Sequence, residues 1–183
     1  MKRVAMLALV LVFGISCDDS PTSPSDPNVA KFTAILLPTN EVAPFGANGA
    51  PAANADAGAS GTMQLTMTVT RDSAQNITGA TYDFTVNITG FPANTTLTGA
   101  HIHNAPAGTN TAVVVGLPLT ATDTAVATGQ STIVKTGLQS TSATVSAAQV
   151  AQGVFNNPAG NYFNVHTSVN TGGAIRGQLV KQN

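Results

Sequence analysis

The sequence predicts an all-β fold, an antiparallel β-sandwich or a Greek-key-like barrel with at most one short helix. Two observations support this. Several short segments alternate apolar and polar residues with the two-residue period of half-buried strands. Short polar or glycine-containing segments separate them, as in sandwiches and barrels. With one cysteine in 183 residues, no disulfide can form within the chain, so core packing and sheet hydrogen bonds must stabilise the fold.

Two runs show the strand period most clearly. Residues 61–70 place apolar side chains at odd positions from 63 to 69, and residues 82–89 place them at even positions. Residues 71–76 between them are polar and predict a hairpin connection. Further strands are expected at residues 31–37, 97–103, 112–117, 129–136, 162–167 and 174–181.

One segment favours a helix. In residues 146–155, Ser146 can act as the N-cap, and Val150, Val154 and Phe155 would lie near one face. Its length suits a short connection across the sandwich.

The N-terminus has the pattern of an export signal that ends at a lipidation site. Lys2 and Arg3 precede an apolar run at residues 4–13 and small residues up to Cys17. The run is about half of the roughly 20 residues that cross a bilayer. The segment resembles the lipobox of bacterial lipoproteins, in which the cysteine becomes the first mature residue and carries acyl chains. We therefore expect a signal peptide at residues 1–16, lipid on Cys17 and an extracytoplasmic position at the cell envelope, anchored to the membrane through that lipid; secretion without lipid is the alternative.

The mature chain is expected to contain a tether and one domain. Residues 17–30 are rich in proline and small polar residues and predict a disordered tether, and residues 31–183 predict the β domain. Removal of the signal leaves five basic residues against eight acidic ones, without the basic cluster that nucleic acid binding requires. Residues 38–60 show neither the strand period nor the helix period, and a mobile flap is expected at 46–58. Within residues 38–60, Glu41 is the side chain suited to chemistry.

Three motifs together carry a family resemblance. They lie at residues 39–44, 99–104 and 162–179. The most specific parts are the Gly-Ala-His-Ile-His string at 99–103 and the Gly-Ala-Ile-Arg-Gly run at 173–177. In this order the motifs resemble the CHRD (chordin-like) domain family. The resemblance implies a β-rich extracellular module and a binding or structural role, so we expect no enzyme activity and no cofactor.

The histidines of the chain all fall within these motifs. His101 and His103 alternate with apolar residues, so a strand directs both imidazoles to one face. In residues 162–167 the polar parity carries His166, and pairing of Ser168 with Ala174 would place His166 across from Arg176. With a loop acid added, the candidate ligand-binding or structural cluster is Glu41, His101, His103, Asn164, His166 and Arg176.

Two interpretations of this cluster remain open. In the preferred one no metal is bound: the cluster contacts a protein or polymer ligand, or fixes the sheet, with Arg176 paired to Glu41 and with His101 and His103 bonded to loops. In the alternative, His101, His103 and His166 bind zinc or copper with an open fourth position. The His-x-His string is similar to that of the copper/zinc superoxide dismutases, so this alternative includes redox chemistry. No serine or cysteine nucleophile stands in a recognisable pattern with a histidine and an acid.

Overall fold

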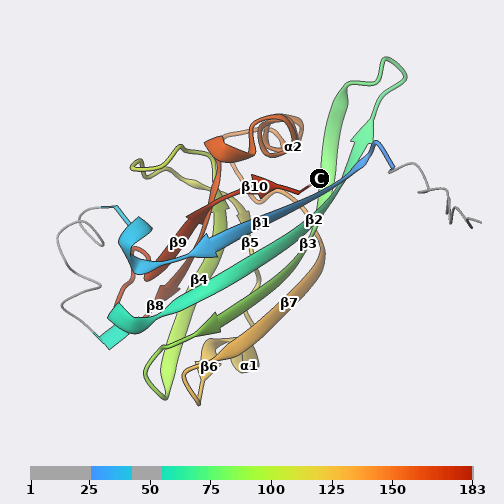
Figure 1. Cartoon of the computed structure of the whole chain (residues 1–183). Coiled ribbons are helices and arrows are strands. Elements are labelled where there is room, and N and C mark those ends of the chain that lie inside the picture. Colours follow the sequence, from blue (N-terminus) through green and yellow to red (C-terminus); the bar gives the residue numbers. More distant parts are fainter. Residues whose placement is uncertain (1–25, 43–54, 183) are drawn as a thin grey trace, which may run out of the picture.

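The computed structural model describes residues 26–42 and 55–182, which form two antiparallel β-sheets packed face to face (Figure 1). The first sheet has the order β10-β1-β2-β3-β7, and the second has the order β5-β4-β8-β9 with β6 paired to β4. The strands are β1 (Val29–Leu36), β2 (Ser60–Arg71), β3 (Ile77–Thr89), β4 (Thr95–His103), β5 (Val113–Gly116), β6 (Ala125–Val126), β7 (Ser131–Leu138), β8 (Tyr162–Thr167), β9 (Ile175–Gln178) and β10 (Val180–Lys181). The helices are η1 (Pro38–Asn40), η2 (Ala55–Gly58), α1 (Ala121–Thr124), α2 (Ala147–Asn156) and η3 (Pro158–Gly160). The expected all-β sandwich is confirmed.

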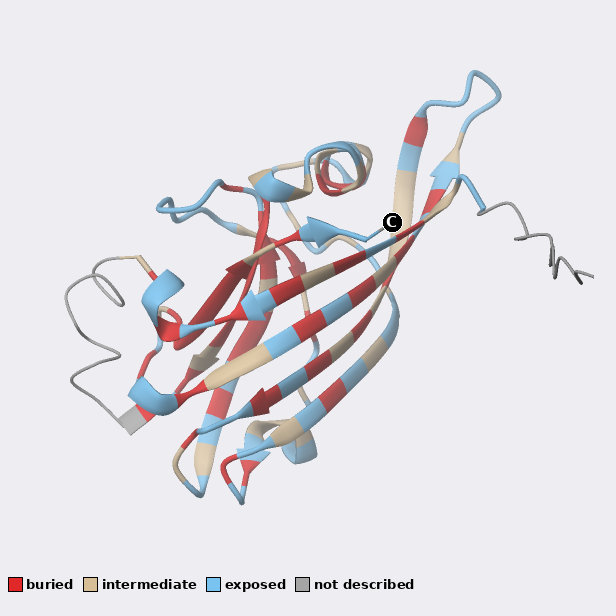
Figure 2. Ribbon diagram, viewed as in Figure 1, coloured by how far each residue is buried: buried red, intermediate tan, exposed pale blue. Residues whose placement is uncertain are grey.

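The first sheet buries one face and exposes the other. In β2 and β3 the apolar side chains predicted to face inward, at odd positions 63–69 and even positions 82–88, are buried. The strand register sets Leu65 opposite Phe84. Figure 2 shows the alternating burial as red and paler bands on the ribbon. The hairpin is also present, and the Asp72 carboxylate closes its turn by accepting hydrogen bonds from the backbone N–H groups of Ala74 and Asn76.

The second sheet is buried on both faces near its centre. Phe163 on β8 faces the core, with its ring 5.9 Å from that of Phe84 across the sandwich. Asn164, on the opposite face, is nevertheless only 2% exposed. That face lies beneath loops from other parts of the chain, and this cover creates a buried polar environment.

The expected strand at 174–181 is two strands. β9 pairs with β8 in the second sheet, and β10 pairs with β1 in the first, so the chain changes sheets at Leu179. Leu37, just after β1, exchanges backbone hydrogen bonds with Arg176 on β9. This pairing places η1 and Glu41 beside the second sheet.

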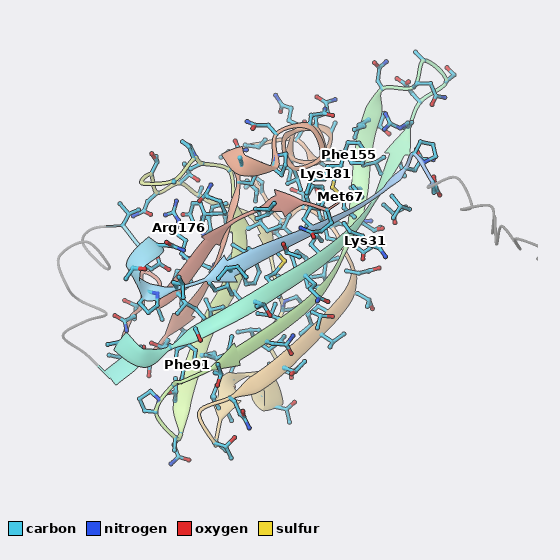
Figure 3. All side chains as sticks on the ribbon, in the orientation of Figure 1. Lys31, Met67, Phe91, Phe155, Arg176 and Lys181 are labelled. Atoms are coloured by element: carbon cyan, nitrogen blue, oxygen red, sulfur yellow. The ribbon has the colours of Figure 1, made fainter. Side chains whose placement is uncertain are left out.

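Helix α2 begins where the sequence predicts. The Ser146 hydroxyl accepts from the backbone N–H of Gln149 in a capping box, and Val150 and Val154 are buried. Phe155 is only partly buried, and the ammonium of Lys181 lies 4.4 Å from its ring centre (Figure 3). The single turn α1 and the two-residue β6 were not expected. Within the described residues, no helix has both the length and the apolar character to cross a membrane.

Several predictions on the N-terminal part lie outside the described residues. These are the signal peptide, Cys17, the tether up to residue 25 and residues 46–54 of the expected flap. β1 begins at Val29, inside the predicted tether of residues 17–30. The end of the expected flap is fixed, because Asp56 is 1% exposed and accepts hydrogen bonds from Thr167 and Asn170 at 2.6 and 2.7 Å.

Candidate functional site

The candidate site lies on the outer face of the second sheet, across β4 and β8. Antiparallel pairing sets Gly99 opposite His166, His101 opposite Asn164 and His103 opposite Tyr162. Paired residues point to the same side of a sheet, so the three imidazoles share one face. The ring centres are 5.5 Å apart for His101 and His103 and 4.8 Å apart for His101 and His166.

The sequence-based register between β8 and β9 is wrong by two residues. Arg176 pairs with Asn164 and not with His166. The reason is the turn, in which the backbone N–H of Ala174 donates to the carbonyl of Val165 rather than pairing with Ser168. The guanidinium lies over the ring of Tyr162.

Backbone carbonyls orient two of the three imidazoles. Nδ1 of His103 lies 2.8 Å from the carbonyl oxygen of Thr111, and Nδ1 of His166 lies 2.8 Å from that of Thr171. Because a carbonyl only accepts, both Nδ1 atoms carry a proton, and each neutral ring keeps its lone pair on Nε2. His103 thus has the loop contact that the sequence predicts. For His101 no loop contact is found within the described residues, where its buried Nδ1 has no hydrogen-bond partner.

The site favours neutral imidazoles. Burial is the main cause that lowers the pKa of all three rings, and the neighbouring histidines lower that of His101 further, to about 4. At neutral pH the rings are uncharged, and a lone pair is available on each.

A stack of three side chains supports His103 from behind. Its ring lies parallel to that of Tyr162, with 4.6 Å between centres and 7° between planes. The Arg176 guanidinium lies over the Tyr162 ring, 3.3 Å from its centre, in a cation–π contact. Arg176 is 1% exposed and points from β9 toward the loop that follows β4 (Figure 3).

Arg176 fixes that loop rather than pairing with Glu41. Its guanidinium donates to the carbonyls of Pro106 and Thr109 and to the side chain of Asn110. The same loop carries Thr111, whose carbonyl orients His103. The expected ion pair with Glu41 is not found within 4 Å; the ion pair that the described residues form is Lys135–Asp123. These three oxygen acceptors satisfy the buried guanidinium in place of a carboxylate.

Glu41 is a buried acid next to this cluster. It is 4% exposed, and burial raises its pKa to about 7, although Arg176 and a hydrogen bond from Asn164 act in the opposite direction. A Cβ at residue 173 would overlap the Glu41 carboxylate in its present position, so the glycine leaves room for it. Oε1 has no hydrogen-bond partner among the described residues.

The structure brings all six predicted residues into one region and adds others that the sequence did not identify. The carbonyls of Thr111 and Thr171 have no sequence signature, since every residue has a carbonyl. Gly99 lies in a recognised motif, but its role depends on packing: a Cβ there would lie 2.8 Å from Nε2 of His101. The glycine lets the His101 ring lie over the strand toward His166.

A comparison with protein families gives one match. A model of the CHRD domain matches residues 32–179, a range that contains all six candidate residues. Neither the curated proteins nor the solved structures give a significant match.

Proposed function

Because the chain belongs to the CHRD domain family, we propose that it is a non-catalytic extracellular binding or structural module. In this proposal lipid on Cys17 tethers it to the bacterial cell envelope, and its ligand occupies the cluster around the three imidazoles. The basic, apolar and small-residue order before Cys17 supports the tether.

One observation supports a ligand at the cluster. Three buried polar atoms, Oε1 of Glu41, Nδ1 of His101 and Nε2 of His166, have no hydrogen-bond partner in the described part of the chain. Each such atom costs about 1–3 kcal/mol of stability relative to a satisfied one. Buried polar groups retained only for structure normally have partners. A ligand that pairs with these atoms explains why the fold keeps them.

The test is the stability of the ligand-free protein. For His101→Leu after chelator treatment and dialysis, we expect a free energy of unfolding within about 1 kcal/mol of that of the wild type, because leucine removes the unpaired Nδ1 and loses only the hydrogen bond with Asn164. Asn161→Ala is the matched control: Asn161 is buried, donates to the carbonyls of Gly153 and Asn157, and should lose about 1–3 kcal/mol. A comparable loss in His101→Leu would assign the cluster a structural role instead.

The tether has its own test. Cells grown with a fatty-acid probe should label the wild type and not Cys17→Ser, and only the wild type should partition into detergent. Equal labelling of both proteins would exclude lipidation at this residue without affecting the ligand proposal.

A metal ion is the second candidate ligand, beside a protein or a polymer. The observation in its favour is that one ligand atom from each of His101, His103 and His166 lies within 4.8 Å of the others. Copper there would also admit redox chemistry of the kind that the superoxide dismutases perform, whereas zinc has no redox chemistry.

A further inference from the structure

We propose that His101, His103 and His166 form a binding site for a single zinc or copper ion, with a fourth coordination position left open. This inference deepens the proposed function by naming the ligand of the cluster, and it rests on that cluster being a binding site. It does not depend on the lipid tether.

The hydrogen bonds of the rings prepare them to coordinate. His103 and His166 each donate Nδ1–H to a backbone carbonyl, which leaves an Nε2 lone pair directed into the cluster. Metal-bound histidines in proteins almost always have their other nitrogen held in this way, because that bond fixes both the tautomer and the ring orientation. Nε2 of His166 has no hydrogen-bond partner in the described residues, as expected of an atom that binds a ligand.

Asn164 also contacts Nε2 of His103, so its amide must turn aside when an ion binds. Oδ1 of Asn164 lies 3.1 Å from Nε2 of His103, while the other side of the amide hydrogen-bonds Glu41. With the proton on Nδ1, a neutral His103 would face this oxygen with a lone pair, and two acceptors repel each other. Rotation of the Asn164 amide relieves this repulsion and also clears the coordination position on Nε2, because the oxygen lies along the direction of that lone pair.

The distances fit after a small adjustment. Three atoms within 4.8 Å of one another all lie within about 2.8 Å of one common point, compared with a zinc–nitrogen bond of about 2.0–2.1 Å. Coordination of an ion at that point therefore requires each nitrogen to move toward it by less than about 1 Å. His101 can move most easily, since its Nδ1 has no hydrogen bond to break within the described residues and Gly99 leaves space beneath its ring.

The chemistry of the three donors selects the class of ion. Imidazole nitrogens suit zinc and copper, whereas calcium and magnesium prefer oxygen ligands. Three protein ligands with an open fourth position are the usual set of a site that exchanges a bound molecule or ion, since a purely structural zinc site has four.

The experiment measures metal binding to the full chain produced without a polyhistidine tag. All proteins carry Cys17→Ser, so that a free thiol cannot bind the ion. After chelator treatment and dialysis, zinc sulfate or copper sulfate is titrated in competition with a chromophoric chelator. We expect one ion per chain, a higher melting temperature on metal addition, and at least a hundredfold weaker binding in each of His101→Gln, His103→Gln and His166→Gln.

Two further measurements keep the test independent of folding failures. Gly99→Ala retains every ligand but fills the space beneath His101, so it should keep the stoichiometry of one and weaken binding at least tenfold. Cobalt(II) should give the intense visible bands of a tetrahedral site in the wild type, and these bands should be lost in His101→Gln. Far-UV circular dichroism establishes which variants fold, and any that does not fold is left out of the comparison.

The outcomes separate this inference from the function proposed above. Absence of stoichiometric binding to the wild type, or equal binding in the folded histidine variants, would overturn the metal site. If the stability of His101→Leu is at the same time within about 1 kcal/mol of that of the wild type, the cluster remains a binding site for a ligand other than a metal. If this variant is destabilised by more than that and no metal binds, both proposals fail together.

Discussion

Replacement of Glu41 by glutamine should stabilise the protein at alkaline pH and leave it nearly unchanged at acidic pH. The carboxyl is 4% exposed, and burial raises its pKa from 4.5 to about 7, so ionisation is harder in the folded state than in the unfolded one. The folded state therefore holds this proton more tightly. The stability linked to it is complete below about pH 4.5 and is lost as pH rises through about 7.

The expected size follows from that pKa change. One pKa unit corresponds to about 1.36 kcal/mol, so the ionised carboxylate lowers the free energy of unfolding by about 3 kcal/mol above pH 7. Glutamine has the same shape and cannot ionise. At pH 8.5 we expect Glu41→Gln to be more stable by about 2–3 kcal/mol, or about 5–10 °C in melting temperature for a chain of this length.

Urea denaturation followed by far-UV circular dichroism, at pH 4.5 and pH 8.5 in the presence of a chelator, measures this difference. Asp72→Asn is the matched control with the opposite sign, because hydrogen bonds from Asn76 lower the pKa of Asp72 in the hairpin turn. The Asp72→Asn variant should be less stable than the wild type at pH 8.5. Equal stabilities of Glu41→Gln and wild type at pH 8.5 would refute the reasoning that the carboxylate is buried without adequate compensation.

Three further predictions concern buried groups. Tyr82→Phe should leave stability unchanged or raise it by about 1 kcal/mol in thermal melts, because the Tyr82 hydroxyl is buried without a partner in the described residues; a loss above about 1 kcal/mol would reveal a hydrogen bond. Gly173→Ala should cost more than about 2 kcal/mol in urea denaturation, since its φ is +135° and its Cβ would meet Glu41; a neutral result would mean that the carboxylate can move away. His101 should contribute a loss of stability as pH falls from about 6.5 to about 4, because its folded pKa lies below its unfolded value. Glu41 acts in the opposite direction over this range, so the loss is measured as the difference between the wild type and His101→Gln, both without metal. That loss is at most about 3 kcal/mol and is reduced by the partial exposure of the ring; an unchanged pH slope in His101→Gln would contradict this assignment.

Local patterns predicted the strands but not how far they extend or which sheet they join. The alternating residues of β2 and β3 fixed which faces are buried, because a two-residue period admits only one inward parity. The run at 174–181 looked continuous, since nothing local indicates that its two ends pair with strands of different sheets. The register of Arg176 was missed for a related reason: it depends on the hydrogen bonds of the Asn170–Gly173 turn, whereas the sequence shows only that a turn is present.

The candidate cluster divides in the same way. The sequence by itself determined the all-β class, the capped helix α2 and the shared face of His101 and His103, because each depends on neighbours within a few residues. Only the tertiary structure decided that His166 reaches them, that the carbonyls of Thr111 and Thr171 set the tautomers, and that the polar face is buried. Those features arise from segments that lie side by side only after the chain has folded, and the burial that lowers the pKa of the histidines and raises that of Glu41 arises in the same step.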